Sequence, residues 1–107
     1  RFAMIETADA LRRVDDIAAT PGLDGLYVGP SDLSLALGGG QGFDKDEPHM
    51  LDAYRAVVDA CRNHGITAGI HTATPAFAAR MAAENGPSLL PRGADSMFSR
   101  HALRPPE

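Results

Sequence analysis

Residues 25–32 read GLYVGPSD, a short apolar run that leads directly into Gly-Pro-Ser-Asp. A run of apolar residues without polar alternation is typical of a strand that is covered on both faces, as in a parallel sheet. Gly29 and Pro30 interrupt this strand, and Ser31 is well placed to cap a short helix over residues 32–37. The segment therefore predicts a strand followed by a helix, with the turn at the carboxyl end of the strand.

The same order of strand and helix repeats on both sides of this segment. Further strands are expected at residues 2–5 and 66–70, with a weaker one at 88–90 between Pro87 and Pro91, and further helices at residues 7–19, 47–63, 75–84 and 95–103. Thr7 and Thr74 are the expected N-caps, and Gly65 is an expected C-cap. The alternation predicts an α/β fold with a parallel sheet and helices outside it. Three full units and a weak fourth correspond to half of a (β/α)8 barrel, and a small open α/β sheet is the alternative architecture.

The composition excludes several classes of partner. The 107 residues are 44% hydrophobic and 22% charged, which is ordinary for a globular domain. Ten basic and 14 acidic residues give a formal net charge of −4, which argues against nucleic acid or an anionic membrane as the partner. No apolar run approaches the roughly 18 to 20 residues of a membrane-spanning helix. Cys61 is the only cysteine, so no internal disulfide forms and a cytoplasmic location is expected.

The first residues indicate part of a longer domain. The chain begins at Arg1, and an apolar strand starts at once. A natural domain rarely opens inside a buried strand. We therefore expect residues 1–107 to form one partial domain whose N-terminal half is missing.

Two carboxylates follow neighbouring strands of the expected sheet. Glu6 comes directly after the first strand, and Asp32 lies in the turn after the second. Neighbouring strands lie about 4.8 Å apart, so both side chains would reach the same rim. Two carboxylates that close repel each other unless a proton or a cation is shared, and a hard divalent ion answers that need. The alternative is that both are acids favoured at helix starts by the helix dipole.

The turn that contains Asp32 and the end of the third strand offer two more candidates. Gly29 lets a ligand approach the backbone, Pro30 stiffens the turn, and the amides of Ser31 and Asp32 favour an anion such as a substrate carboxylate. An ordinary strand-to-helix turn is the alternative interpretation. His71 follows the third strand and is a weak candidate for acid–base chemistry or for a ligand, or else a structural histidine.

Two of these stretches together resemble a known family. MIET at residues 4–7, followed about one helix later by LDGLYVGPSDLS at residues 23–34, is similar to the HpcH/HpaI aldolase/citrate lyase family. The resemblance implies a TIM (β/α)8 barrel, with this chain as strands five to eight. It also implies a class II, metal-dependent pyruvate aldolase, a carbon–carbon lyase whose Mg²⁺, Mn²⁺ or Co²⁺ ion is held by Glu6 and Asp32. Substrate binding would then fall on Gly29, Pro30, Ser31 and Asp32, with the Ser31 backbone amide on the pyruvyl carboxylate.

The reaction implied by the resemblance is cleavage of a 4-hydroxy-2-oxo acid to pyruvate and an aldehyde. The histidine and the arginine that serve this reaction in the family come from the first half of the barrel, so His71 is not assigned to either role. Met4 stands where some members carry a substrate-binding glutamine, and a homo-oligomer is expected for the full-length protein. A citrate-lyase-type acyl-CoA lyase is one alternative. A non-enzymatic, truncated α/β module, with an exposed edge at residues 2–5, is the other.

Overall fold

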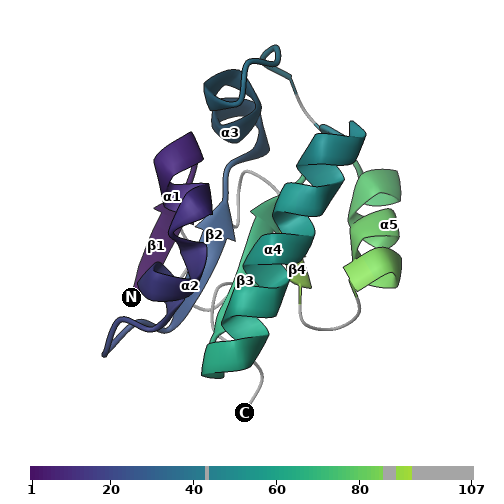
Figure 1. Cartoon of the computed structure of the whole chain (residues 1–107). Coiled ribbons are helices and arrows are strands. Elements are labelled where there is room, and N and C mark those ends of the chain that lie inside the picture. The colour runs from purple at the N-terminus through teal and green to yellow at the C-terminus, as the bar shows by residue number, and fades with distance from the viewer. Residues whose placement is uncertain (43, 86–88, 93–107) are drawn as a thin grey trace.

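The computed structural model describes residues 1–42, 44–85 and 89–92. Its strands are β1 (Phe2–Ile5), β2 (Gly25–Val28), β3 (Thr67–His71) and β4 (Leu89–Arg92). All neighbouring pairs are parallel, and the strands lie in the order β1-β2-β3-β4 (Figure 1). The predicted α/β fold with a parallel sheet is therefore confirmed.

The helices follow the strands as expected, with one interruption. They are α1 (Ala8–Arg12), α2 (Val14–Ala18), α3 (Pro30–Ala36), α4 (Pro48–His64) and α5 (Pro75–Asn85). The single helix expected over residues 7–19 is wrong, because the backbone of Arg13 leaves the helical region at φ −102° and ψ 19°. The break has a packing consequence: α2 packs on α4 and buries Val14 and Ala18, whereas α1 has no buried residue.

Two further details of the prediction need correction. Helix α3 begins at Pro30 and not at residue 32, because proline is favoured in the first position of a helix. The hydroxyl of Ser31 does not cap α3; it accepts a hydrogen bond from the Gly42 amide at 3.2 Å. The weak fourth strand does form, as β4, and it includes Pro91. The helix expected at residues 95–103 lies outside the described residues.

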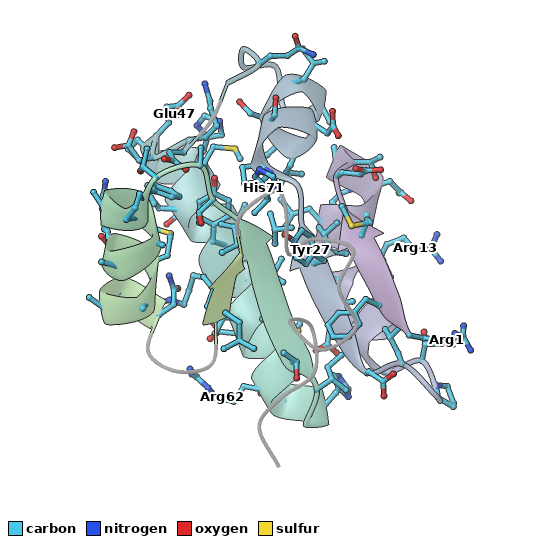
Figure 2. All side chains as sticks on the ribbon, turned by 180° about the vertical axis from the view of Figure 1, so that it is seen from behind. Arg1, Arg13, Tyr27, Glu47, Arg62 and His71 are labelled. Atoms are coloured by element: carbon cyan, nitrogen blue, oxygen red, sulfur yellow. The ribbon has the colours of Figure 1, made fainter. Side chains whose placement is uncertain are left out.

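The core lies between the sheet and the helices that cover one of its faces, α4 foremost among them (Figure 1). Alternate strand residues point into this core, and these include Ile5, Leu26, Val28, Ala68, Ile70 and Leu89. They meet the apolar face of α4, where Tyr54, Val57 and Val58 are completely buried. Tyr27 and His71 lie on the side of the sheet turned away from α4 (Figure 2). The caps expected at Thr7, Gly65 and Thr74 are confirmed, since Thr7 and Thr74 accept amide hydrogen bonds and Gly65 has a left-handed φ of 68°.

None of the described helices combines the length and the apolar character needed to cross a membrane.

Candidate metal and substrate site

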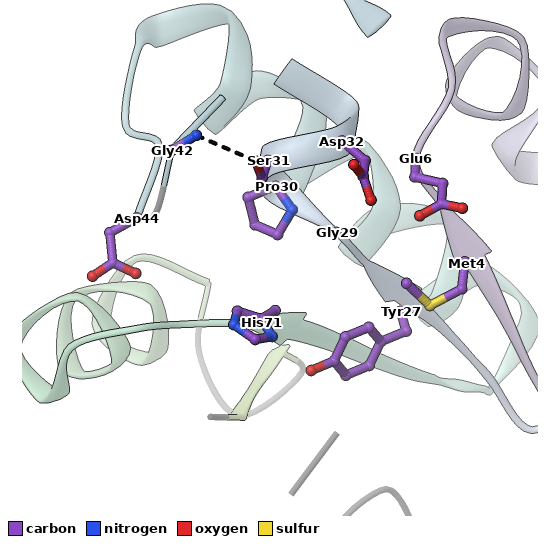
Figure 3. A pocket seen from close by; sticks show the side chains of 10 residues that line it. All are labelled: Met4, Glu6, Tyr27, Gly29, Pro30, Ser31, Asp32, Gly42, Asp44 and His71. Carbon is purple, nitrogen blue, oxygen red and sulfur yellow. Dashed lines mark hydrogen bonds between the residues drawn. The ribbon is translucent and has the colours of Figure 1, made fainter. Parts of the chain in front are cut away.

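A pocket of about 220 Å³ opens at the carboxyl ends of β1, β2 and β3 (Figure 3). The register of the sheet explains why polar residues meet there. Ile5 pairs with Val28, and Val28 pairs with Ile70, so the three strands end at the same level. The pocket is lined by Met4, Glu6, Tyr27, Gly29, Pro30, Ser31, Asp32, Gly42, Asp44 and His71. The structure thus brings together every site residue that the sequence nominated.

Glu6 and Asp32 approach the pocket from different elements. Glu6 follows β1 and is half-buried, whereas Asp32 is exposed in the first turn of α3. Their carboxylates face one another across the pocket (Figure 3). Gly29 lies between them, and a Cβ atom there would stand 3.6 Å from both Glu6 Oε2 and the Met4 methyl carbon. Any side chain longer than alanine at Gly29 would therefore crowd the Glu6 carboxylate.

The donor set fits a hard divalent cation. Three carboxylates line the pocket, namely Glu6, Asp32 and Asp44, and the described lining contains no lysine or arginine to neutralise them. No group of three or more His, Cys, Asp or Glu side chains comes together to hold a metal within the described ranges, as a four-ligand zinc site would require. Mg²⁺ and Mn²⁺ need less from the protein, because one or two carboxylates suffice when water and substrate oxygens complete the shell. The Glu6–Asp32 pair meets that requirement.

His71 lies at the end of β3 and is half-buried at the pocket wall. Within the described part of the chain its imidazole makes no hydrogen bond. A general base is normally oriented by a partner on its second ring nitrogen. The geometry therefore places His71 in the lining of the pocket.

Asp44 is the main residue that sequence reasoning missed. Its carboxylate accepts hydrogen bonds from the Ala73 amide at 2.8 Å, from the Thr74 amide at 3.0 Å and from the Thr74 hydroxyl at 2.6 Å. These partners lie about thirty residues further along the chain, so no local pattern could reveal the contact. The only signal in the sequence is that aspartate tolerates the left-handed backbone conformation that Asp44 adopts.

Tyr27 also lines the pocket, and Gly69 on the neighbouring strand packs against its ring. Tyr27 is almost fully buried, and a Cβ atom on Gly69 would stand only 3.0 Å from its ring. The absence of a side chain at Gly69 on β3 therefore makes room for the Tyr27 ring on β2. Tyr27 stands inside an apolar run, so nothing in the sequence indicated that it lines the pocket.

The βα repeats and the acidic pocket at the strand ends place the chain among parallel α/β proteins with a site at the carboxyl ends of the strands. Comparison with known proteins identifies the family. The chain belongs to the HpcH/HpaI aldolase/citrate lyase family, whose sequence profile matches residues 2–102. The hydroxypyruvate/pyruvate aldolase of Paraburkholderia phytofirmans is 37% identical over 103 residues, which cover 96% of this chain and 38% of that protein. The 5-keto-4-deoxy-D-glucarate aldolase of Escherichia coli O6:H1 is 36% identical over 103 residues, covering 96% of this chain and 39% of that protein.

A solved structure agrees with these sequence relationships. The crystal structure of an HpcH/HpaI aldolase from Desulfitobacterium hafniense DCB-2 matches 89% of this chain with a TM-score of 0.70 and 35% identity. The match covers 36% of that chain. The chain therefore spans less than two fifths of the length of these relatives.

Proposed function

We propose that residues 1–107 form strands five to eight of the (β/α)8 barrel of a metal-dependent class II pyruvate aldolase. The observation that carries this proposal is the pair of carboxylates, Glu6 and Asp32, facing one another across a pocket at the strand ends. Active sites of (β/α)8 barrels are built at this end of the sheet. The relatives are named as aldolases. They are more than twice as long as this chain, which supports a barrel larger than the chain alone.

In this proposal Glu6 and Asp32 hold a Mg²⁺, Mn²⁺ or Co²⁺ ion. The ion would supply Lewis acidity, which stabilises negative charge developing on a keto oxygen. The first amides of a helix have no partner within the helix, so the Ser31 amide, in the first turn of α3, is available to a substrate carboxylate. Gly29 leaves the space beside Glu6 open, and Pro30 fixes the direction in which α3 leaves the strand.

The proposed reaction is cleavage of a 4-hydroxy-2-oxo acid to pyruvate and an aldehyde. The family resemblance places the groups for proton transfer in the first half of the barrel, so we assign that step to residues outside this chain. The 107-residue chain alone would then bind the metal ion and the substrate without turning the substrate over. The full-length protein would be a cytoplasmic homo-oligomer. The described lining has no lysine or arginine for the phosphates of coenzyme A, which favours the aldolase over an acyl-CoA lyase.

Calorimetric titration with Mn²⁺, with and without oxalate as a mimic of the pyruvate enolate, tests the proposed site. We expect Glu6→Gln and Asp32→Asn each to weaken Mn²⁺ binding about ten-fold or more, because each removes one of two anionic ligands. Oxalate should strengthen Mn²⁺ binding to the unsubstituted chain only. Asp52→Asn, at an exposed position on α4, is the matched control and should leave the affinity unchanged.

Absence of Mn²⁺ binding by a chain that circular dichroism shows to be folded would exclude a preformed metal site. Equal binding by the Glu6→Gln and Asp52→Asn variants would place the ion elsewhere on the surface.

A further inference from the structure

Asp44 has a backbone conformation that a residue with a side chain adopts at a cost. Its φ is 51°, and it is the only non-glycine residue with a positive φ in the described ranges. The left-handed region crowds the Cβ atom against the backbone, although aspartate tolerates it better than most residues. Strain of this kind persists where surrounding interactions enforce it, and such positions gather at functional sites.

The interactions that enforce it reach across to the start of α5. The Asp44 carboxylate accepts from the Ala73 amide, the Thr74 amide and the Thr74 hydroxyl, a set of contacts that we name the Asp44 clasp. The Thr74 hydroxyl oxygen also accepts from the Phe77 amide at 3.2 Å, so the clasp continues into the N-cap of α5. A carboxylate has about four acceptor positions, and three of them are used here.

The same segment is tied to the opposite side of the pocket. Two residues before Asp44, the Gly42 amide donates to the Ser31 hydroxyl at 3.2 Å (Figure 3). Gly42, Asp44 and Ser31 all line the pocket. The segment after α3 therefore joins the turn that follows β2 to the turn that follows β3, and the two ties lie within three residues of each other.

The rest of the segment is fixed away from the pocket. The Tyr54 hydroxyl on α4 donates to the Lys45 carbonyl at 2.7 Å, and Arg80 on α5 pairs with Asp46 at 2.9 Å. None of these residues belongs to the pocket lining. Asp46 therefore offers a neighbour of the same chemistry that is also anchored to α5 but lies outside the site.

We propose that Asp44 is a positioning residue: its clasp on Ala73 and Thr74, the two residues before α5, holds the pocket wall opposite Glu6 and keeps Gly42 on the Ser31 hydroxyl. The inference rests on the proposed function in one respect, namely that this pocket receives a 2-oxo acid. With its carboxylate engaged by Ala73 and Thr74, Asp44 is not a ligand of the ion. If the substrate's keto and carboxylate oxygens lie beside an ion on Glu6 and Asp32, the rest of the substrate would extend toward Asp44, whose negative charge would disfavour a second carboxylate.

Amide hydrogen exchange, followed by NMR on the ligand-free chain, tests the clasp directly. Asp44→Gly removes the carboxylate and suits the positive φ, so it loses the clasp without adding strain. We expect exchange to accelerate about ten-fold at Ala73, Thr74 and Gly42. Asp46→Asn should leave those three amides unchanged. Unchanged exchange at Gly42 in the Asp44→Gly variant would overturn the proposal.

A second pair of variants changes Thr74, the partner of Asp44 in the clasp. Thr74→Val removes the hydroxyl donor and keeps the shape, whereas Thr74→Ser keeps the hydroxyl. Faster exchange at Gly42 in the valine variant, restored in the serine variant, is the result expected of a clasp that spans the pocket. Equal exchange at Gly42 in the two variants would show that the Thr74 hydroxyl plays no part, and would contradict the proposed clasp.

Ligand binding separates this inference from the proposed function. For the Mn²⁺-loaded chain, Asp44→Gly should leave the Mn²⁺ affinity within about two-fold and lower the preference for pyruvate over 2-oxoglutarate about five-fold. A large loss of Mn²⁺ affinity would make Asp44 a ligand and overturn the positioning role. If the unsubstituted chain binds neither Mn²⁺ nor pyruvate, the proposed function fails, and the exchange measurements decide the clasp by themselves.

Discussion

Gly25 lies on β2 between two close neighbours, Phe2 on β1 and Thr67 on β3. It pairs with Phe2 on β1 and with Thr67 on β3. A Cβ atom built on Gly25 would meet the Thr67 carbonyl oxygen and would stand 2.5 Å from a ring carbon of Phe2. The Phe2 ring can move aside, but the Thr67 carbonyl belongs to the sheet backbone and cannot. The close spacing of β2 and its neighbours at the amino ends of the strands therefore depends on the absence of a side chain here.

Replacing Gly25 with alanine should destabilise the chain by about 1 to 3 kcal/mol, as overpacking does in a well-packed interior. Urea unfolding followed by circular dichroism measures the change. Gly40→Ala is the matched control, because nothing lies within 4 Å of a Cβ atom at that position. A Gly25→Ala variant as stable as the Gly40→Ala variant would show that the sheet is looser than the structure indicates.

At this scale two of the three pocket acids, Glu6 and Asp32, could be predicted, and Asp44 could not. Glu6 and Asp32 follow apolar runs, and the ends of parallel strands meet at one edge, so the rule for strand ends located them. Asp44 lies in a glycine-rich segment, and its partners Ala73 and Thr74 are distant in the chain. The hydrogen bonds of Asp44 form only after the fold has brought its segment beside the turn that follows β3.

Helix boundaries could be predicted where a cap marks them. Gly65 ends α4 in the left-handed conformation, and Thr74 with Pro75 begins α5, as their residue types indicate. The break at Arg13 could not be predicted, because apolar residues continue at helical spacing through it. The break accompanies the packing of α2 on α4, a contact between distant segments that a local pattern does not reveal.

A buried thiol on helix α4 should make the stability of the folded chain depend on pH in the alkaline range. Cys61 lies on its buried face with an exposed fraction of 1%, and this burial raises the pKa of its thiol from 9.0 to about 11. The unfolded chain therefore ionises first as the pH rises. Stability is complete below pH 9 and should decrease between about pH 9 and 11, by on the order of 2 kcal/mol at the upper end.

The measurement is urea unfolding at a series of pH values from 7 to about 10.5, compared with Cys61→Ala. The alanine variant should lose less stability over this range, whatever its stability at pH 7. Tyr54, whose burial also raises the pKa of its hydroxyl, is present in both proteins and cancels from the comparison. Parallel pH profiles for the two proteins would show that the buried thiol does not ionise on unfolding in this range.

At the scale of the whole molecule, the described strands form an open parallel sheet. In parallel α/β proteins such a sheet is usually closed into a barrel or covered by helices on both faces. Among the described strands, β1 and β4 each have one unpaired edge. Helices cover one face, and Tyr27 and His71 point to the other (Figure 2). Edges of this type favour pairing with further strands, and a barrel removes them altogether. A chain that spans less than two fifths of its relatives' length fits the proposal that four more strands complete the barrel.

A chimera tests that proposal at the scale of the molecule. The part of the Paraburkholderia phytofirmans aldolase that precedes its matched region would be joined to Arg1 of this chain. With Mn²⁺ and a 4-hydroxy-2-oxo acid, we expect the chimera to release pyruvate, because it combines the Glu6–Asp32 pair with the proton-transfer groups of the other strands. The 107-residue chain alone should release none, and Glu6→Gln in the chimera should abolish release. Pyruvate release by the chain alone would place the proton-transfer group within these residues, whereas a folded, Mn²⁺-binding but inactive chimera would argue against this chain as strands five to eight.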